Sequence, residues 1–377
     1  MKIVHICLAC FYVEGMGYQE NILTQFHAEM GHDVTILTSD YTFNPKYQTE
    51  TRENWDYVND FGVHVKVLGK QVKYGAFEGL YEELDRIKPD VIMAHGGQFV
   101  AIRDVIKYCK RNKDVLLYID QHADYYNTPV NTFKRRLAQK LIYGRLMRKA
   151  VRYTKKFWGV TPWRCTYLND VYGIPKSKID LLVMGGDDRY IHFENRTEIR
   201  ANIRERLGFG ADDFVLITGG KIDAPKNIHL LMKAMENIDG KAKLIVFGQP
   251  NDAMAPIIEE LSKNDRIRHI GWIDAKDVYD YYLASDLAVF PGTHSVLWEQ
   301  ACATGLPGVY KDWEGMHHVN VDGSAVFVKD VSAASLAEAV NGVINGKYDE
   351  MKAAAENKGR QEFSYRKISA RAIGLDE

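Results

Sequence analysis

Two lysines lie close together in the stretch GGKIDAPKN, directly after an apolar run typical of a buried strand. Lys221 and Lys226 flank a turn that precedes a predicted helix. Ammonium groups beside a helix N-terminus suit a diphosphate, because their charges add to the positive end of the helix dipole. Gly220 allows the backbone to approach such a ligand closely. The stretch lacks the G-x-x-x-x-G-K-[ST] pattern of a P-loop, and two solvated surface lysines are the alternative interpretation.

A second stretch, PGTHSVLWEQACATGLPG, follows another predicted strand. Polar residues at its start can cap the helix that comes next. The backbone amides there can hold a phosphate, and a carboxylate or amide in the first helical turns can accept hydrogen bonds from vicinal hydroxyls. The residues concerned are Thr293, His294, Ser295, Val296, Glu299 and Gln300. An ordinary capped helix is the alternative.

Two further loops carry candidate residues near the start of the chain. The loop EGMG contains Gly15 and Gly17, which permit close backbone approach to a ligand, although a tight turn explains them equally well. It is not a full G-x-G-x-x-G, which disfavours a dinucleotide dehydrogenase. In IDQHAD, His122 and Asp124 follow a predicted strand and can bind a sugar hydroxyl or assist at a reacting centre.

The elements that position these loops alternate between strand and helix. The first set of predicted strands is KIVHIC, HDVTILT, VHVKVLG, DVIMAHG, DVLLYID and KFWGVTP. A second set starts after about Leu181 with FVLITGG, KLIVFG, IRHIGWI, LAVFPG, PGVY and AVFVKD. Strands alternating with helices predict parallel sheets wrapped by helices, and two sets predict two Rossmann-like domains. Because ligands bind past the carboxyl ends of such strands, we expect the chemistry in these loops, facing a central cleft.

Composition and charge narrow the class of protein. The chain has 377 residues, 46% of them hydrophobic and 26% charged, as expected for a globular protein of two domains. The net charge of −1 gives no support for nucleic-acid binding. Residues 1–180 carry 26 Lys and Arg against 20 Asp and Glu, whereas residues 181–377 carry 23 against 30. The net charge of +6 for the first segment and −7 for the second favours two separate domains with different neighbours.

Cysteine usage and hydropathy predict a cytoplasmic protein. No apolar run is long enough to span a bilayer, and the N-terminus lacks the pattern of a signal peptide. The cysteines are odd in number and scattered, which is typical of a reducing compartment. They are Cys7, Cys10, Cys109, Cys165 and Cys302. Cys7 and Cys10 form a C-x-x-C, but without a second pair two buried thiols are favoured over a zinc or redox site.

Taken together, the loops resemble glycosyltransferase family 4, the retaining sugar-nucleotide-dependent enzymes of GT-B fold. GMGYQENILTQFHAEMGHDVTILTSD resembles the first glycine loop, helix and second strand of that family. GGKIDAPKNIHLLMKAM resembles its phosphate-binding segment, with Lys221 where Arg is usual and Lys226 on the family's Lys. IRHIGWIDAKDVYDYYLASDLAVFPG resembles the base-binding loop, including Gly271 and Ile273, and FSYRKISARAIG resembles the terminal crossover helix.

The stretch after Pro291 departs from the family pattern P-S-x-x-E-G-F-G-x-x-x-x-E-A-x-A-x-G-x-P. In the family the first Glu contacts the donor sugar and the second contacts the ribose. Aligning Gly305 and Pro307 with the final G-x-P places Gln300 on the second Glu, with Glu299 one residue early. The loop is about three residues short, so the first Glu has no counterpart and His294 is a candidate replacement.

The resemblance implies both an organisation and a mechanism. Residues 1–180 with the crossover helix 361–377 would form the acceptor-side domain, and residues 181–360 would bind the nucleotide sugar. Lys221, Lys226 and the loop amides would stabilise the charge on the departing nucleoside diphosphate, with UDP favoured by family frequency. The chain has no D-x-D triad for a metal-bound diphosphate, so no metal or other cofactor is expected. His122 would face the donor sugar, and the anomeric configuration would be retained.

The acceptor side is indicated by FKRRLAQKLIYGRLMRKAVRYTKKFW, residues 133–158, which hold ten Lys or Arg and no acid. Apolar residues recur there at helical spacing: Leu137, Leu141, Ile142, Leu146, Ala150 and Val151. A basic amphipathic helix is typical of an anionic membrane surface, and a core-packed helix with a solvated basic face is the alternative. Lipid-linked acceptors are common in the family. We therefore expect a peripheral enzyme that extends a glycan or lipid-linked acceptor of a bacterial-type surface polysaccharide or glycoconjugate.

Three other functions fit parts of the sequence. A sugar-nucleotide epimerase of GT-B fold would share the diphosphate clamp but need no acceptor. A non-catalytic partner subunit would bind donor weakly without turnover, and the missing first Glu favours it. A two-domain sugar-binding protein is disfavoured because no export signal precedes the first strand. A retaining glycosyltransferase remains the principal prediction.

Overall fold

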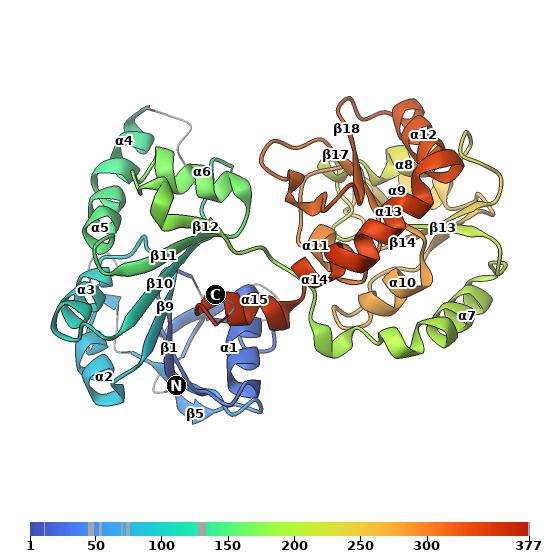
Figure 1. Cartoon of the computed structure of the whole chain (residues 1–377). Helices are drawn as coiled ribbons and strands as arrows, with labels where there is room; N and C mark the ends of the chain where they lie inside the picture. The colour runs from blue at the N-terminus through green and yellow to red at the C-terminus, as the bar shows by residue number, and fades with distance from the viewer. Residues whose placement is uncertain are drawn as a thin grey trace. The chain divides into compact units, whose positions relative to one another are not determined.

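The computed structural model describes residues 1–10, 12–43, 49–52, 55–68, 71–72, 76–126 and 133–375. The chain divides into an N-terminal unit, Met1–Val183 with Tyr365–Glu377, and a C-terminal unit, Met184–Ser364 (Figure 1). These boundaries lie within a few residues of those predicted at 180/181 and 360/361. Of the predicted crossover segment, residues 376–377 lie outside the described residues.

The N-terminal unit is built on an eight-stranded sheet in the order β12-β11-β10-β9-β1-β2-β6-β5. All neighbours are parallel except β5 with β6. The strands are β1 (Lys2–Cys7), β2 (Asp33–Thr38), β5 (Asp56–Val58), β6 (His64–Val67), β9 (Val91–His95), β10 (Leu116–Gln121), β11 (Thr154–Gly159) and β12 (Ile179–Leu181). The central strands are buried on both faces, which explains their nearly continuous apolar sequences.

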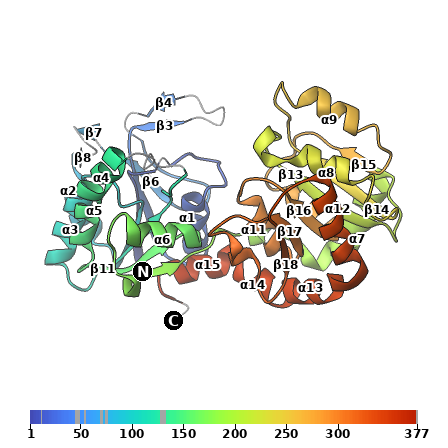
Figure 2. The same ribbon diagram turned by 90° about the horizontal axis from the view of Figure 1, so that it is seen from above.

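Helices cover both faces of this sheet. Figure 1 shows α2, α3, α4 and α5 on one face and α1 with α15 on the other. The helices are α1 (Gln19–Glu29), α2 (Leu80–Ile87), α3 (Ile102–Arg111), α4 (Phe133–Leu141), α5 (Tyr143–Ala150), α6 (Pro162–Asp170) and α15 (Tyr365–Ala372). Two hairpins were not predicted, β3 (Tyr41–Phe43) with β4 (Thr49–Thr51) and β7 (Gln71–Val72) with β8 (Ala76–Phe77). Figure 2 shows β3 and β4 side by side at the edge of the unit.

The prediction of one basic helix over 133–158 is wrong. Helix α4 ends at Leu141, α5 begins at Tyr143, and residues 154–159 form β11 in the central sheet. The apolar residues of this segment are also divided. Leu146 and Ala150, on α5, are buried in the core, whereas Leu137 and Leu141 on α4 and Ile142 between the two helices are exposed.

The C-terminal unit contains a six-stranded, fully parallel sheet in the order β15-β14-β13-β16-β17-β18. Its strands are β13 (Phe214–Gly219), β14 (Ala242–Phe247), β15 (Ile267–His269), β16 (Leu287–Phe290), β17 (Gly308–Lys311) and β18 (Ala325–Val328). Its helices are α7 (Arg196–Leu207), α8 (Ile228–Ala234), α9 (Ala255–Leu261), α10 (Val278–Ala284), α11 (Leu297–Ala303), α12 (Ala333–Gly342), α13 (Tyr348–Ala354) and α14 (Arg360–Glu362). The strand order reverses between β13 and β16, which is where ligands bind in open α/β sheets.

Each unit has its own apolar core, as two predicted Rossmann-like domains require. The hydrophobic pattern of the sequence located every central strand because parallel strands buried on both faces have few polar positions. Among the described helices, none combines the length and hydropathy needed to cross a bilayer.

Candidate functional site

The two loops that carry the candidate phosphate-binding residues meet at the point where the strand order reverses in the C-terminal unit. Lys226 Nζ donates hydrogen bonds to the carbonyl oxygens of Thr293 at 2.7 Å and His294 at 3.4 Å. Asn227 Nδ2 donates to the carbonyl of Pro291 at 3.0 Å. A Cβ on Gly292 would lie 2.3 Å from Cα of Lys226, so only glycine permits this approach.

The two candidate lysines have different surroundings. The side chain of Lys221 is 76% exposed and lies 3.3 Å from Asp223 Oδ2. Lys226 is half-buried, and burial lowers the pKa of its ammonium group, with Lys221 adding to the effect and Asp223 opposing it. Its hydrogen bonds to two carbonyls leave one N–H of the ammonium group for another acceptor. Lys226 is therefore the better-positioned of the two for an anionic ligand.

The expected side-chain cap on the helix after β16 is absent. Helix α11 begins at Leu297, its N-cap is Val296, and no side chain caps it. Thr293, His294 and Ser295 instead form the loop that packs against Lys226. The sequence suggested a cap because it could not show that the helix begins two residues beyond Ser295. Ser295 and Val296 are half-buried in this loop.

Glu299 is fully buried, and its carboxylate lies between two histidines. Its Oε1 accepts hydrogen bonds from His294 Nε2 at 2.8 Å and from His318 Nε2 at 2.9 Å. Burial raises the pKa of Glu299, but the two histidines outweigh that effect and hold the pKa well below its usual range. Gln300, the next residue, is half-buried. Of the two candidates for a ribose contact, Glu299 is thus already engaged inside the protein.

The expected base-binding loop follows β15. Gly271 has a φ of +72°, in the left-handed region, and its carbonyl accepts a 2.7 Å hydrogen bond from the amide of Gly248. This contact joins the loops after β14 and β15. Ile273 is half-buried, and Trp272 between them is 72% exposed.

In the N-terminal unit, the glycine loop leads into the first helix as predicted. Gly15 has a φ of +77° and is exposed together with Gly17, and α1 begins at Gln19. Glu14, at the start of the loop, accepts a hydrogen bond from Tyr57 on β5. This hydrogen bond connects the glycine loop to β5, the edge strand of the sheet.

His122 lies beside a buried carboxylate. Its Nε2 is 3.4 Å from Oδ1 of Asp120, and Asp120 Oδ2 lies 2.6 Å from Nδ1 of His95. The amide of Gly96 also donates to Asp120 Oδ1 at 2.9 Å. Burial alone would raise the pKa of Asp120, but His95 and His122 hold it well below its usual range. Burial alone would lower the pKa of His95, but Asp120 raises it to about 10.

A chain of buried histidines continues from this pair to the C-terminal helix. His5 contacts His95 at 2.8 Å and His27 at 3.0 Å through its two ring nitrogens, and His27 Nε2 lies 2.7 Å from the carbonyl of Ser369 on α15. Because a carbonyl only accepts, His27 Nε2 must carry a proton, which fixes the direction of every hydrogen bond back to Asp120. Burial lowers the pKa of His27 to about 4 and that of His5 well below its usual value. His27 and His5 are thus neutral, and His95 is charged.

These shifts predict how stability depends on pH. The raised pKa of His95 contributes stability that is fully present below about pH 6.5 and lost as the pH rises to about 10. The lowered pKa of His27 acts oppositely and removes stability as the pH falls from about 6.5 to about 4. In the alkaline window the free energy of unfolding should fall by up to about 1.4 kcal/mol per pH unit, and His95→Gln should flatten this slope.

Denaturant titrations at pH 7, 8 and 9 test this expectation. His192→Gln is the matched control, because His192 is exposed and lies 3.6 Å from the exposed Glu194. An alkaline slope that is equally steep in wild type and His95→Gln would contradict a buried charge on His95.

Asp124, a predicted substrate-binding residue, already has protein partners. Its Oδ1 accepts from the amide of Tyr126 at 2.9 Å, and its Oδ2 accepts from Arg164 Nε at 3.2 Å. The carboxylate is buried. In this arrangement Asp124 shapes the loop after β10.

Within the described part of the chain, two groups have ligand atoms close enough to surround a metal ion: His95, Asp120 and His122, and His294, Glu299 and His318. Within each group the ligand atoms lie within 4.8 Å of one another. In both, the donor–acceptor distances are those of hydrogen bonds between histidine and carboxylate. The chemistry that this arrangement offers directly is the orientation of His294 by a buried carboxylate, whereas His122 lies 3.4 Å from another.

Sequence reasoning missed the buried partners His5, His27, His95, Asp120 and His318. One signal was available, because a histidine within the apolar strand KIVHIC and another at the end of VIMAH are buried polar groups that require partners. The identity of those partners was not available. His5 and His95 are 90 residues apart in sequence.

Comparison with known proteins finds similarity to glycosyltransferases. Residues 199–362 match the family model described as glycosyl transferases group 1. Over 152 residues the chain is 29% identical to TuaC of Bacillus subtilis (strain 168), whose name assigns it provisionally as a teichuronic acid biosynthesis glycosyltransferase. That match covers 39% of this chain and 37% of TuaC. The chain thus matches 35–44% of the length of these curated relatives.

Solved structures match almost the whole chain. Alr3699/HepE of Anabaena, in complex with UDP, superposes with a TM-score of 0.66 at 16% identity, covering 98% of each chain. WaaG, a glycosyltransferase involved in lipopolysaccharide biosynthesis, superposes with a TM-score of 0.60 at 15% identity, covering 98% of this chain and 99% of WaaG. At these identities the likeness shows the fold, and it confirms the expected pair of Rossmann-like domains.

Proposed function

From the match of residues 199–362 to the family model of glycosyl transferases group 1, we propose that the chain is a retaining glycosyltransferase. It moves a sugar from a nucleoside-diphosphate sugar, UDP-linked by preference, to a glycan or lipid-linked acceptor. The observation that carries the proposal is the contact between Lys226 and the carbonyls of Thr293 and His294 at the reversal of strand order. Both loops also carry the candidate phosphate-binding residues of the sequence.

The residues of the C-terminal unit are assigned roles on this basis. Lys226, with Lys221 and the amides around Ser295 and Val296, stabilises the negative charge on the departing diphosphate, so that no metal is required. Gln300 contacts the ribose, because Glu299 is committed to two histidines. The loop of Gly271 and Ile273 holds the base.

The N-terminal unit supplies the acceptor side. Gly15 and Gly17 let the loop after β1 approach the substrate closely, and we assign His122, which lies 3.4 Å from the Asp120 carboxylate, to a contact with the donor sugar. HepE in complex with UDP supports the choice of base by fold analogy alone.

A turnover assay tests the proposal. The protein is incubated with UDP-, GDP-, ADP- and dTDP-sugars in EDTA, and release of nucleoside diphosphate is measured with and without glycan and lipid-phosphate acceptors. Release that requires an acceptor supports a transferase, and the anomeric configuration of the product by NMR reports retention. Release or isomerisation without any acceptor would favour the epimerase, and binding without turnover would favour the non-catalytic partner.

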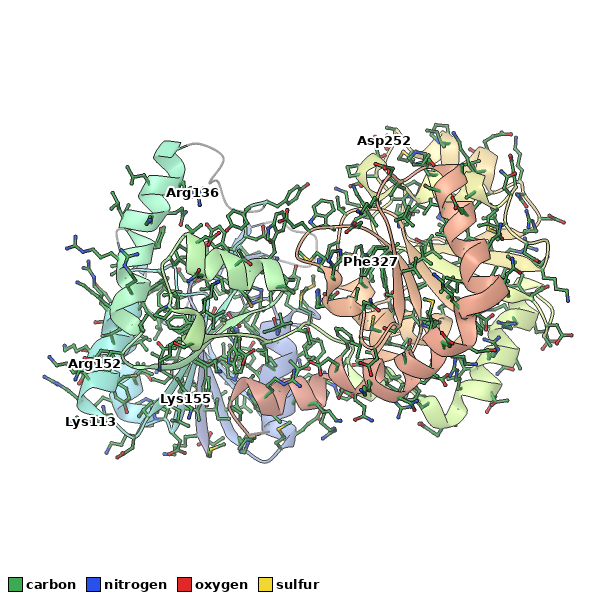
Figure 3. The ribbon with its side chains drawn as sticks, turned by 45° about the horizontal axis from the view of Figure 1, so that its top comes forward. Lys113, Arg136, Arg152, Lys155, Asp252 and Phe327 are labelled. Atoms are coloured by element: carbon green, nitrogen blue, oxygen red, sulfur yellow. The ribbon has the colours of Figure 1, made fainter. Side chains whose placement is uncertain are left out.

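We further propose that α4 and α5 bring the enzyme to the cytoplasmic face of an anionic membrane. Arg136 on α4 and Arg152 and Lys155 in the segment after α5, which are labelled in Figure 3, are exposed basic residues. Leu141 and Ile142, at the junction of the helices, are 58% and 55% exposed. Exposed apolar side chains flanked by basic residues suit the interface of an anionic bilayer.

Vesicle sedimentation provides the test. Wild type should bind vesicles rich in phosphatidylglycerol, release them at high salt, and bind phosphatidylcholine weakly. Leu141→Ser with Ile142→Ser should lower partitioning about tenfold or more, because two apolar side chains no longer enter the interface. Ile257→Ser, at a 39% exposed position on α9, is the control. Equal binding to both lipids, or no effect of the double substitution, would contradict a membrane-docking surface here.

A further inference from the structure

Glu299 is an unusual residue for the buried side of a short helix. It is fully buried, both histidine contacts fall on Oε1, and Oε2 has no hydrogen-bond partner among the described residues. A buried carboxylate oxygen without a partner costs free energy, which a residue that served stability alone would not retain. The side chains of His294, Glu299 and His318 come, in that order, from the loop after β16, from α11, and from the turn His317–Val319 between β17 and β18.

The two histidines bonded to Glu299 differ in their access to the surface. The side chain of His294 is 11% exposed, whereas that of His318 is 4% exposed and that of Glu299 is fully covered. Nδ1 of His318 is buried without a partner among the described residues, and Nδ1 of His294 is not among such atoms. His294 is therefore the ring that can meet a ligand, and His318 lies behind it.

Packing and hydrogen bonding together define the orientation of the His294 ring. Its edge-to-face contact with Trp298 has a centroid separation of 5.1 Å, and Trp298 in turn stacks on Tyr310 at 4.7 Å. Because Glu299 is ionised, His294 Nε2 must carry the proton of their hydrogen bond. With that proton on Nε2, Nδ1 is the ring nitrogen left to accept a hydrogen bond.

His294 also lies beside the candidate diphosphate site, since Lys226 donates to the carbonyls of Thr293 and His294 itself. In any sugar nucleotide the diphosphate separates the nucleoside from the sugar. A side chain next to the diphosphate, in a loop separate from the base-binding loop, is therefore placed for the sugar.

From these contacts we propose that Glu299 and His318 are positioning residues that hold His294 with Nδ1 free to accept a hydrogen bond from a hydroxyl of the donor sugar. The inference rests on the proposed glycosyltransferase function and deepens it. His294 becomes a residue that selects the sugar, and the buried Glu299 acts through it. The unpartnered Oε2 and the second histidine bond on Oε1 are consistent with a carboxylate whose purpose is orientation.

The test combines kinetics with a double-mutant cycle. His318→Phe and His294→Asn should each lower kcat for turnover of the preferred sugar nucleotide about tenfold or more. The affinity for UDP, which lacks the sugar, should change less than about twofold, since no contact to the nucleotide is lost. Because His318 acts through His294, the double variant should lose no more than His294→Asn alone. His318→Gln keeps an N–H donor and should recover part of the activity.

His317→Phe is the matched control. His317 is the neighbouring residue, but it bonds Asp312 at 2.6 Å and is exposed, so this variant should keep wild-type kcat. If His318→Phe fails to fold, His318→Gln and the NMR measurement below carry the test. Additive losses in the double variant, or a full loss of UDP affinity in His318→Phe, would overturn the positioning role.

Imidazole ¹⁵N NMR gives a readout independent of activity. The resonances of His294, assigned by their loss in His294→Asn, should show a neutral ring protonated at Nε2, and His318→Phe should bring exchange between tautomers. A ring protonated at Nδ1 in the wild type would overturn the inference while leaving the transferase function intact. A wild type that binds no sugar nucleotide would instead overturn the proposed function, and this inference with it.

Discussion

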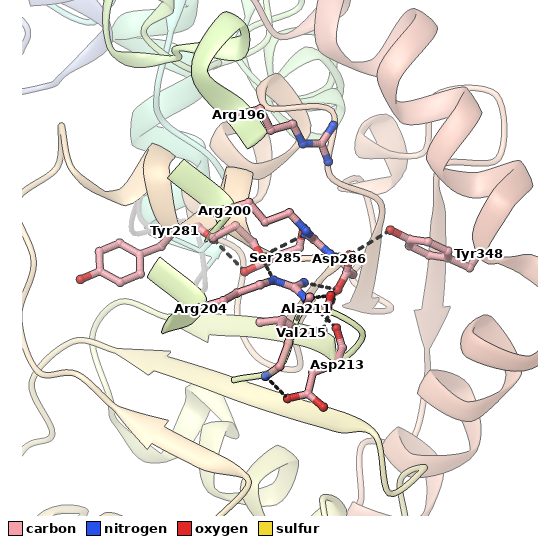
Figure 4. Close-up of polar contacts among 12 residues, drawn as sticks. Arg196, Arg200, Arg204, Ala211, Asp213, Val215, Tyr281, Ser285, Asp286 and Tyr348 are labelled. Carbon is pink, nitrogen blue, oxygen red and sulfur yellow. Dashed lines mark hydrogen bonds and ion pairs between the residues drawn. The ribbon is translucent and has the colours of Figure 1, made fainter. Parts of the chain in front are cut away.

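Replacing Asp286 by alanine is expected to destabilise the C-terminal unit by about 3–5 kcal/mol, the usual cost of removing one partner from a buried ion pair. The carboxylate, just before β16, accepts hydrogen bonds from Arg200 Nη2 and Arg204 Nη2, each at 2.6 Å, and from the amide of Val215 at 2.7 Å (Figure 4). The side chain of Arg204 is only 3% exposed. Without Asp286, its guanidinium would remain buried and charged with only carbonyl acceptors.

The consequence extends beyond stability, because Asp286 joins helix α7 to strands β13 and β16. These are the two strands that end at the candidate site. Denaturant unfolding of Asp286→Ala should therefore show an early transition of the C-terminal unit, while Asp252→Ala, an exposed position labelled in Figure 3, should match wild type. A loss below about 1 kcal/mol would mean that the pair behaves as a solvated surface ion pair.

Replacing Lys226 by alanine is expected to weaken binding of the preferred nucleoside diphosphate by about 1.5–3 kcal/mol, or roughly 10- to 150-fold. The half-buried ammonium group has one N–H left for a phosphate oxygen, and its partial desolvation strengthens a charge-assisted contact. Lys221 is 76% exposed, so Lys221→Ala should cost less. Isothermal titration calorimetry provides the comparison.

Lys233→Ala is the control, since Lys233 lies on α8 directly after the same loop but is exposed. If Lys226→Ala bound as tightly as wild type while Lys221→Ala lost affinity, the roles of the two lysines would be reversed. If neither changed affinity, the diphosphate would not bind at these loops.

Much of the fold could be predicted because its signals are local. The central strands of both sheets are apolar throughout, and glycines mark several loops, so alternation of strand and helix was visible in the sequence. The break between α4 and α5 was not visible, because no Gly or Pro occurs between Leu141 and Tyr143 and the apolar periodicity continues through Ile142. The short hairpins have too few residues to show a period.

The sequence indicates only part of the candidate site, and what it leaves undecided has a physical cause. Residue types and spacing identified the loops that carry Lys226 and His294. They could not decide between Glu299 and Gln300, because adjacent helix positions point about 100° apart and either can face inward. The structure turns Glu299 inward to His318, a partner 19 residues away. Contacts between side chains that are distant in sequence depend on how the strands are ordered, which composition and spacing do not encode.

We propose metal-independent binding of a nucleoside diphosphate by the C-terminal unit, through Lys226 and the loop after β16. Its most direct test is a thermal-shift panel of UDP, GDP, ADP, CDP and dTDP, with their sugar conjugates, in EDTA and in Mg²⁺. We expect the diphosphate of one base, UDP by preference, to raise Tm equally in EDTA and in Mg²⁺, and Lys226→Ala to abolish the shift. No shift with any nucleotide, or a shift seen only with Mg²⁺, would contradict it.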